Sequence, residues 1–186
     1  MKRLLLVLPI LFALVLTTHY VYAQAPLAMT PALSPTPTPQ IDYPLPYPGI
    51  LPDNPLYQLK TLRDRIVSFF IADPLRKADF DLLQADKRVN AGYFLFLQRH
   101  NKEALIALTI SKGDNYFSLG LGKAQEAIKQ GEDANDLLRR MHDAAFTYES
   151  LLTKMISQSN GSLQTNLQSE EKRVQEFEKQ VASLRK

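Results

Sequence analysis

The stretch DPLRKADFDLLQADKRVNAGYFLFLQ, residues 73–98, decides the fold of this chain. Apolar or small residues recur in it at every third or fourth position, and they are Leu75, Ala78, Leu82, Ala85, Val89, Gly92 and Phe96. Residues with this spacing share one face of an α-helix. Asp73 is suited to cap a helix N-terminus, and Pro74 follows it where proline is favoured, in the first turn. The stretch therefore predicts an amphipathic helix over 74–99.

A shorter leading helix is predicted over 55–71, because Asn54 and Pro55 repeat the same start signal. Arg63 and Arg65 are expected to point away from its buried face. That face is formed by Leu59, Leu62, Ile66 and Phe69.

Three more helices are predicted over 101–130, over 133–158 and from 163 to the C-terminus, separated by Gly131 and by the turn SNGS at 159–162. Their stripes are Ile106, Ile110, Gly113, Phe117, Leu121, Ala124 and Ile128 in the first, Leu138, Met141, Ala145, Tyr148, Leu152 and Met155 in the second, and Leu163, Leu167, Glu170, Val174, Phe177, Val181 and Leu184 in the third.

Long helices joined by short turns must lie beside antiparallel neighbours. We therefore predict an all-α fold, an antiparallel up-and-down bundle of four long helices with the shorter helix in front. The sustained 3–4 spacing favours coiled-coil-like crossing angles. SKGDN at 111–115 could break the third long helix, which we interpret as continuous. Glycines within the helices are expected to admit bulky aromatic neighbours, and they are Gly92, Gly113, Gly120 and Gly122.

Residues 1–23 have the three parts of a secretory signal: a basic start, an apolar run over 4–16 and a small-residue exit at Ala23. Retention of this segment as an anchor is the alternative. Residues 24–50 are rich in proline and predict an extended linker, whose later part, from Tyr43, carries apolar residues that could pack on the domain. The helical domain is expected over 51–186, and the mature chain is expected outside the cytoplasm without a stable membrane span.

Composition argues against most catalytic and cofactor chemistry. The chain of 186 residues has no cysteine, three histidines and a net charge of +3. These values exclude disulfides and Cys-ligated metals, and they give no electrostatic footprint for nucleic acid. No Glu-x-x-His pair accompanies His100 or His142, and GLGK at 120–123 does not complete a phosphate loop. We expect no cofactor, no metal and no enzymatic activity.

The stretch ILPDNPLYQLKTLRDRI, residues 50–66, together with the helix start at Asp73 and Pro74, resembles a bacterial family of exported proteins with an all-helical domain of unknown function. The resemblance covers about residues 50–155. It implies an extracytoplasmic all-α domain and no particular activity. The matching residues of its first motif are Leu51, Pro52, Pro55, Leu56, Tyr57, Leu59 and Lys60.

We therefore expect a non-catalytic exported module that binds or scaffolds a protein in the cell envelope. The alternative is an envelope stress sensor or a holdase-like chaperone that binds exposed apolar segments. A homodimer through the C-terminal helix is also considered.

Two candidate sites follow from the sequence. The motif is interpreted as a structural clasp, in which Leu51 staples onto Leu59 and the Tyr57 ring covers the end of the bundle, rather than as a ligand site. A candidate apolar surface lies on the helices predicted over 74–99 and 101–130, unless the last helix covers it. Its residues are Tyr93, Phe94, Tyr116 and Phe117.

Overall fold

The computed structural model describes residues 43–98 and 102–185, and five helices make up most of these ranges. They are α2 (Tyr57–Phe70), α3 (Pro74–Leu97), α4 (Glu103–Lys129), α5 (Asn135–Ser157) and α6 (Gly161–Leu184). The described ranges contain no strand, so the predicted all-α fold is confirmed. Helix α4 is continuous through Gly113. The predicted signal segment, the linker up to residue 42 and His100 lie outside the described residues.

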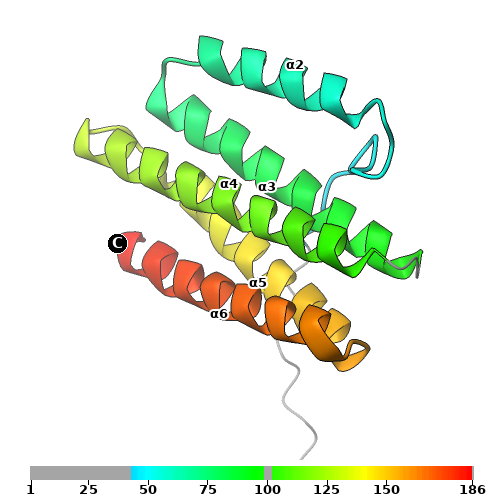
Figure 1. Cartoon of the computed structure of the whole chain (residues 1–186). Helices are drawn as coiled ribbons and strands as arrows, with labels where there is room; N and C mark the ends of the chain where they lie inside the picture. Colours follow the sequence, from blue (N-terminus) through cyan, green and yellow to red (C-terminus); the bar gives the residue numbers. More distant parts are fainter. Residues whose placement is uncertain (1–42, 99–101, 186) are drawn as a thin grey trace, which may run out of the picture. The chain divides into compact units, whose positions relative to one another are not determined.

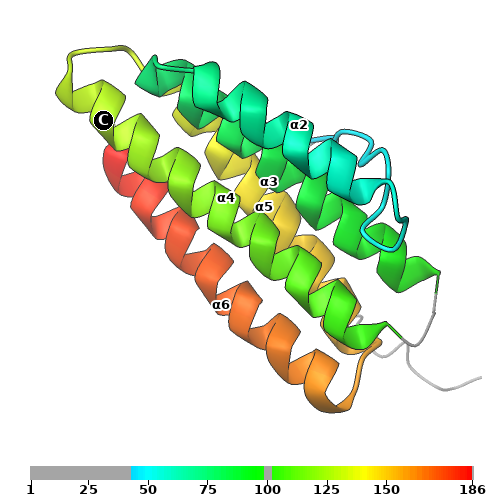
Figure 2. The ribbon, with the colours of Figure 1, turned by 45° about the horizontal axis from the view of Figure 1, so that its top comes forward.

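Helices α3 to α6 form a four-helix bundle built from two antiparallel pairs, α3 with α4 and α5 with α6. The pairs pack together through α4 against α6 and α3 against α5 (Figures 1 and 2). The apolar stripes predicted for these four helices face the interior of the bundle and are thus confirmed. The largest fully buried side chains are Leu82, Val89, Leu95, Ile110, Phe117, Leu138, Met141, Tyr148, Leu152, Met155, Leu167 and Val174.

The α3–α4 contact is close because small residues line it. A Cβ atom added to Gly113 would lie 2.8 Å from Val89 Cγ2, and one added to Gly92 would lie 2.5 Å from Ile110 Cδ1. The neighbours are thus aliphatic, and the expectation of aromatic neighbours was wrong. Gly122 has no neighbour within 4 Å of such a Cβ and plays no part in the contact.

The segment before α2 packs on the bundle. Pro48 is buried, and Tyr43, Leu45 and Leu51 lie against the core. The side-chain amide of Asn90 donates a hydrogen bond of 2.9 Å to the carbonyl oxygen of Pro46. The proline-rich segment predicted as a linker is therefore in contact with the bundle from Tyr43 onward.

Candidate functional site

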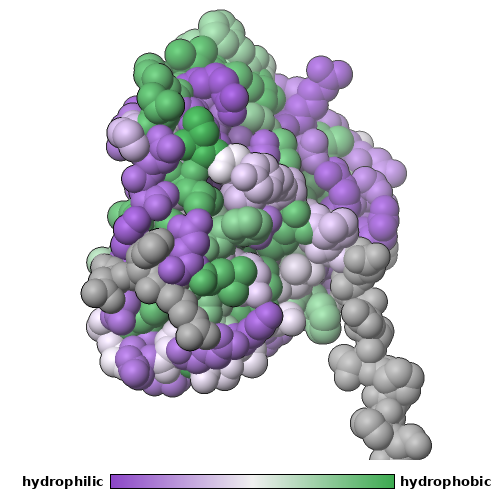
Figure 3. Space-filling view, turned by 90° about the vertical axis from the view of Figure 1, so that its right-hand side faces the viewer, coloured by the Kyte–Doolittle hydropathy of each residue, from purple (hydrophilic) through white to green (hydrophobic). Residues whose placement is uncertain are grey.

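Helix α2 lies outside the four-helix bundle, alongside α3 and α4, and its backbone approaches theirs at few points (Figures 1 and 2). Its apolar side chains point outward, which contradicts the predicted buried face. Phe69 is 84% exposed and Leu59 65%. Figure 3 shows apolar residues gathered at the top of the molecule, where α2 lies. The outward face, as we call this surface, consists of Leu59, Leu62, Ile66, Phe69 and Phe70.

The inward side of α2 is mostly polar. Its two buried residues are Tyr57 and Asp64, and the Asp64 carboxylate pairs with Arg63 at 2.7 Å. Lys77 on α3 donates a hydrogen bond of 2.7 Å to the carbonyl oxygen of Ser68. Since polar and aromatic groups already occupy the side toward α3 and α4, the apolar stripe faces solvent.

Basic residues border the outward face. Helix α2 carries Lys60, Arg63 and Arg65, and its single acidic residue is the buried Asp64. Lys87 of α3 joins Lys60 and Arg63 around a hollow beside the N-terminal part of α2. The outward face is therefore an apolar surface with a basic border, a pattern typical of helices that bind apolar surfaces rimmed with negative charge.

Between α2 and the α3–α4 pair runs a cleft of about 580 Å³, lined by groups from all three helices. Arg88 of α3 is only 5% exposed, and its guanidinium lies over the rings of Tyr57 and Tyr116, 5.2 and 5.4 Å from their centroids. Four further basic side chains line the cleft, namely Arg65, Lys77, Lys112 and Lys123. Sequence analysis missed this cleft because its basic residues lie on three separate helices.

The motif residues divide between the two sides of the helix start. Tyr57 is 8% exposed, and Lys60 donates a hydrogen bond of 2.5 Å to the carbonyl oxygen of Pro48. Pro55 and Leu56 are exposed, whereas Leu51 and Pro52 are half-buried. Leu59 points outward, so the predicted staple from Leu51 was wrong: the inward side of this turn is taken by Tyr57.

The candidate apolar surface is not a surface at Phe117, which is fully buried and stacks on Phe177 of α6 with ring centroids 4.9 Å apart. At this residue the last helix covers the predicted surface, which was the alternative stated above. Tyr93, Phe94 and Tyr116 are half-buried. Each has a close partner: Lys154 for the Tyr93 ring, Tyr47 for Phe94 and Arg88 for Tyr116.

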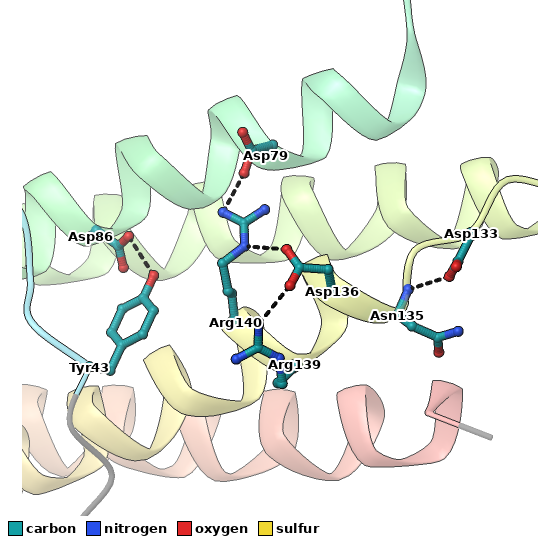
Figure 4. Close-up of polar contacts among 8 residues, drawn as sticks. All are labelled: Tyr43, Asp79, Asp86, Asp133, Asn135, Asp136, Arg139 and Arg140. Atoms are coloured by element: carbon teal, nitrogen blue, oxygen red, sulfur yellow. Dashed lines mark hydrogen bonds and ion pairs between the residues drawn. The ribbon is translucent and has the colours of Figure 1, made fainter.

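A buried polar cluster joins the leading segment to the bundle. Asp86 of α3 accepts hydrogen bonds from Tyr43 at 2.9 Å, drawn in Figure 4, and from Tyr148 of α5 at 2.6 Å. Burial raises the pKa of Asp86 to about 6, while the two tyrosine hydroxyls oppose the shift. Burial and the Asp86 carboxylate raise the pKa of both tyrosines.

Arg140 of α5 forms ion pairs with Asp79 of α3 at 2.7 Å and with Asp136 at 3.2 Å, and thus connects α3 to α5 (Figure 4). Both carboxylates are exposed, so this network stabilises the pairing of helices only modestly. We interpret these ion pairs as structural, because they join two helices and include no nucleophilic side chain.

Asp114 of α4 is fully buried, and no donor among the described residues reaches either of its carboxylate oxygens. Burial, and next to it the nearby Glu170 of α6, raise the pKa of Asp114 well above its usual range. The pair lies inside the α4–α6 contact and not in a cleft.

No protein-family model, curated protein or solved structure matches this chain. The resemblance of residues 50–155 to a family of exported proteins therefore stays a prediction. Within the two described ranges, no cluster of histidine and carboxylate side chains could hold a metal ion. None of the helices in these ranges is long and apolar enough to cross a lipid bilayer.

Proposed function

We propose that this protein is a non-catalytic, exported module that binds a partner in the cell envelope through the outward face of α2. The predicted signal segment supports the export, and the orientation of α2 supports the binding surface. A homodimer through α6 would have to use another surface, since the apolar stripe of α6 is buried within the chain.

The outward face is the observation that carries this proposal. Burying one leucine, isoleucine or phenylalanine side chain is worth roughly 1.5–3 kcal/mol, and the face presents five of them together. Contiguous exposed apolar residues on a folded domain mark an interaction surface. The basic border predicts a partner that is apolar at its centre and acidic at its margin.

Co-sedimentation with envelope membranes tests the proposal. We expect the purified domain to sediment with them, and the triple variant Leu62→Ser/Ile66→Ser/Phe69→Ser to remain in the supernatant. Membranes stripped of protein by protease distinguish the occupant: loss of binding identifies an envelope protein, and retained binding identifies the lipid surface.

The matched control is Leu83→Ser/Leu97→Ser/Leu108→Ser, which removes three exposed leucines from α3 and α4. It should bind like the unmodified domain. Equal binding by both triple variants would contradict the proposal, because the outward face would then contribute nothing specific.

A holdase-like chaperone is the second candidate, favoured by the same exposed apolar residues. In that case the domain suppresses aggregation of a heat-denatured client enzyme at substoichiometric amounts, and the α2 triple variant does not. Absence of suppression at equimolar amounts would rule this function out.

A further inference from the structure

Five basic side chains and a single acidic one, Asp81, line the cleft between α2 and the α3–α4 pair. The side chain of Arg88 makes no hydrogen bond or ion pair with any described residue, although the residue is nine-tenths buried. Arginine stays protonated at any physiological pH, so it cannot relieve its burial by losing the proton. The two tyrosine rings compensate part of the cost of burial, since they offer their negative faces to the guanidinium.

The other charges of the cleft reinforce this imbalance. Arg65 and Lys112 are exposed and have no acidic partner among the described residues, while Lys123 pairs with Glu126 at its outer end. The acidic residue in the lining is Asp81, which is buried; burial raises its pKa, and the nearby Lys77 and Lys123 oppose the shift. One carboxyl group cannot balance five basic side chains. Asp64 is buried nearby on α2 but pairs with Arg63 and does not line the cleft.

We propose that this cleft is a binding site for a multiply charged phosphate group, with Arg88 at its floor and Arg65 and Lys112 at its rim. The site lies on the inward flank of α2 and goes beyond the partner surface proposed above.

Phosphate fits the cleft better than a carboxylate does. A phosphate monoester carries roughly 1.5 to 2 negative charges and three strong acceptor oxygens, whereas a carboxylate carries one charge and two oxygens. Several cations converge here from three helices, and a guanidinium can donate two parallel hydrogen bonds to phosphate. The hydroxyl of Ser68 lies in the same lining and can donate a further hydrogen bond.

Titration calorimetry with tripolyphosphate at low ionic strength tests the site. We expect a Kd below about 100 μM, weakened by added salt because the rim charges are exposed. Arg88→Gln should weaken binding at least about tenfold, and the exposed double variant Arg65→Gln/Lys112→Gln by a similar factor. Lys172→Gln, an exposed charge removal on α6, should leave the affinity unchanged.

The double variant keeps the test decisive if Arg88→Gln does not fold, since both of its positions are exposed. Affinity that is unchanged in the double variant, or reduced equally by Lys172→Gln, would overturn the proposal. Binding of citrate as tight as that of tripolyphosphate would overturn the assignment to phosphate.

Vesicles of phosphatidylcholine with phosphatidic acid identify the source of the phosphate. Vesicle binding that Arg88→Gln abolishes supports the site and assigns it to a lipid headgroup. If Arg88→Gln removes tripolyphosphate binding but not vesicle binding, the site is supported and its ligand is soluble. If neither probe binds in a way that depends on Arg88, the inference is wrong, whatever the α2 triple variant shows.

Discussion

Asp86 connects three parts of the molecule through one carboxylate, since it accepts hydrogen bonds from Tyr43 before α2 and Tyr148 on α5. Its pKa of about 6 lies above the usual value for aspartate near 3.8. The folded state therefore holds its proton to a higher pH than the unfolded state does. The resulting stabilisation is complete below about pH 4 and is lost as the pH rises through 6.

Replacing Asp86 by asparagine should flatten the pH dependence of stability. We expect the free energy of unfolding of the unmodified domain to fall between pH 4 and pH 7, with up to about 3 kcal/mol of that fall due to Asp86. Urea titrations at both pH values measure it. Glu176→Gln, on the exposed surface of α6, is the control. If the free energy of unfolding of Asp86→Asn depends on pH as steeply as that of the control, this explanation is contradicted. The pKa of Asp114 is also raised, so Asp114 should contribute in the same direction.

Tyr57 is one of the side chains that hold α2 to the bundle, because it is buried beneath Arg88 while its outward neighbours contact solvent. Tyr57→Ala should lower the free energy of opening α2 by about 2–4 kcal/mol, the cost of truncating a buried aromatic ring. Hydrogen exchange of the α2 amides measures this opening. Protection of α5 should change little, and equal losses in α2 and α5 would mean that α2 unfolds only with the whole bundle.

At the scale of single helices, the 3–4 patterns predicted which residues share a face for all five helices. Whether this face is buried was predicted correctly only for α3 to α6, because these four helices pack around one common core. Helix α2 lies outside this closed core, and Tyr57, Asp64 and Ser68 occupy its inward side. Its pattern of apolar residues is the same as that of a core helix, so periodicity could not distinguish the two orientations.

The basic cleft was unpredictable for a related reason. Arg88 stands within the regular pattern of α3, and nothing in the neighbouring sequence marks it as buried. Its environment arises from Tyr57 and Tyr116, which lie 31 and 28 positions away, on α2 and α4. The stacking of Phe117 on Phe177 is likewise a contact between distant segments.

Two phenylalanines test the orientation of the helices directly. Phe177→Ala on α6 should lower the free energy of unfolding by about 3 kcal/mol, since the ring is buried against Phe117. Phe69→Ala on α2 should cost less than about 0.5 kcal/mol, because that ring is exposed. Chemical denaturation measures both. The reverse order of the two costs would show that α2 buries the stripe described here as outward.

At the scale of the whole molecule, a closed four-helix bundle supports one helix whose apolar face is not used in folding. The segment from Tyr43 to Pro48 and the side chains of Tyr57 and Lys77 hold this helix against the bundle. The fold thereby presents the outward face on a rigid support, which lowers the entropic cost of binding a partner.

The central claim is that the outward face of α2 becomes covered when the protein binds its envelope partner. The chain has no cysteine, so a single cysteine can be labelled with a polarity-sensitive fluorophore at one chosen position. Ile66→Cys on α2 and Leu108→Cys on α4 form a matched pair, because Ile66 is 51% exposed and Leu108 50%. On addition of envelope membranes, the label at position 66 should shift its emission to the blue, while the label at position 108 should not. A shift at position 108 alone, or binding without a shift at position 66, would contradict the claim.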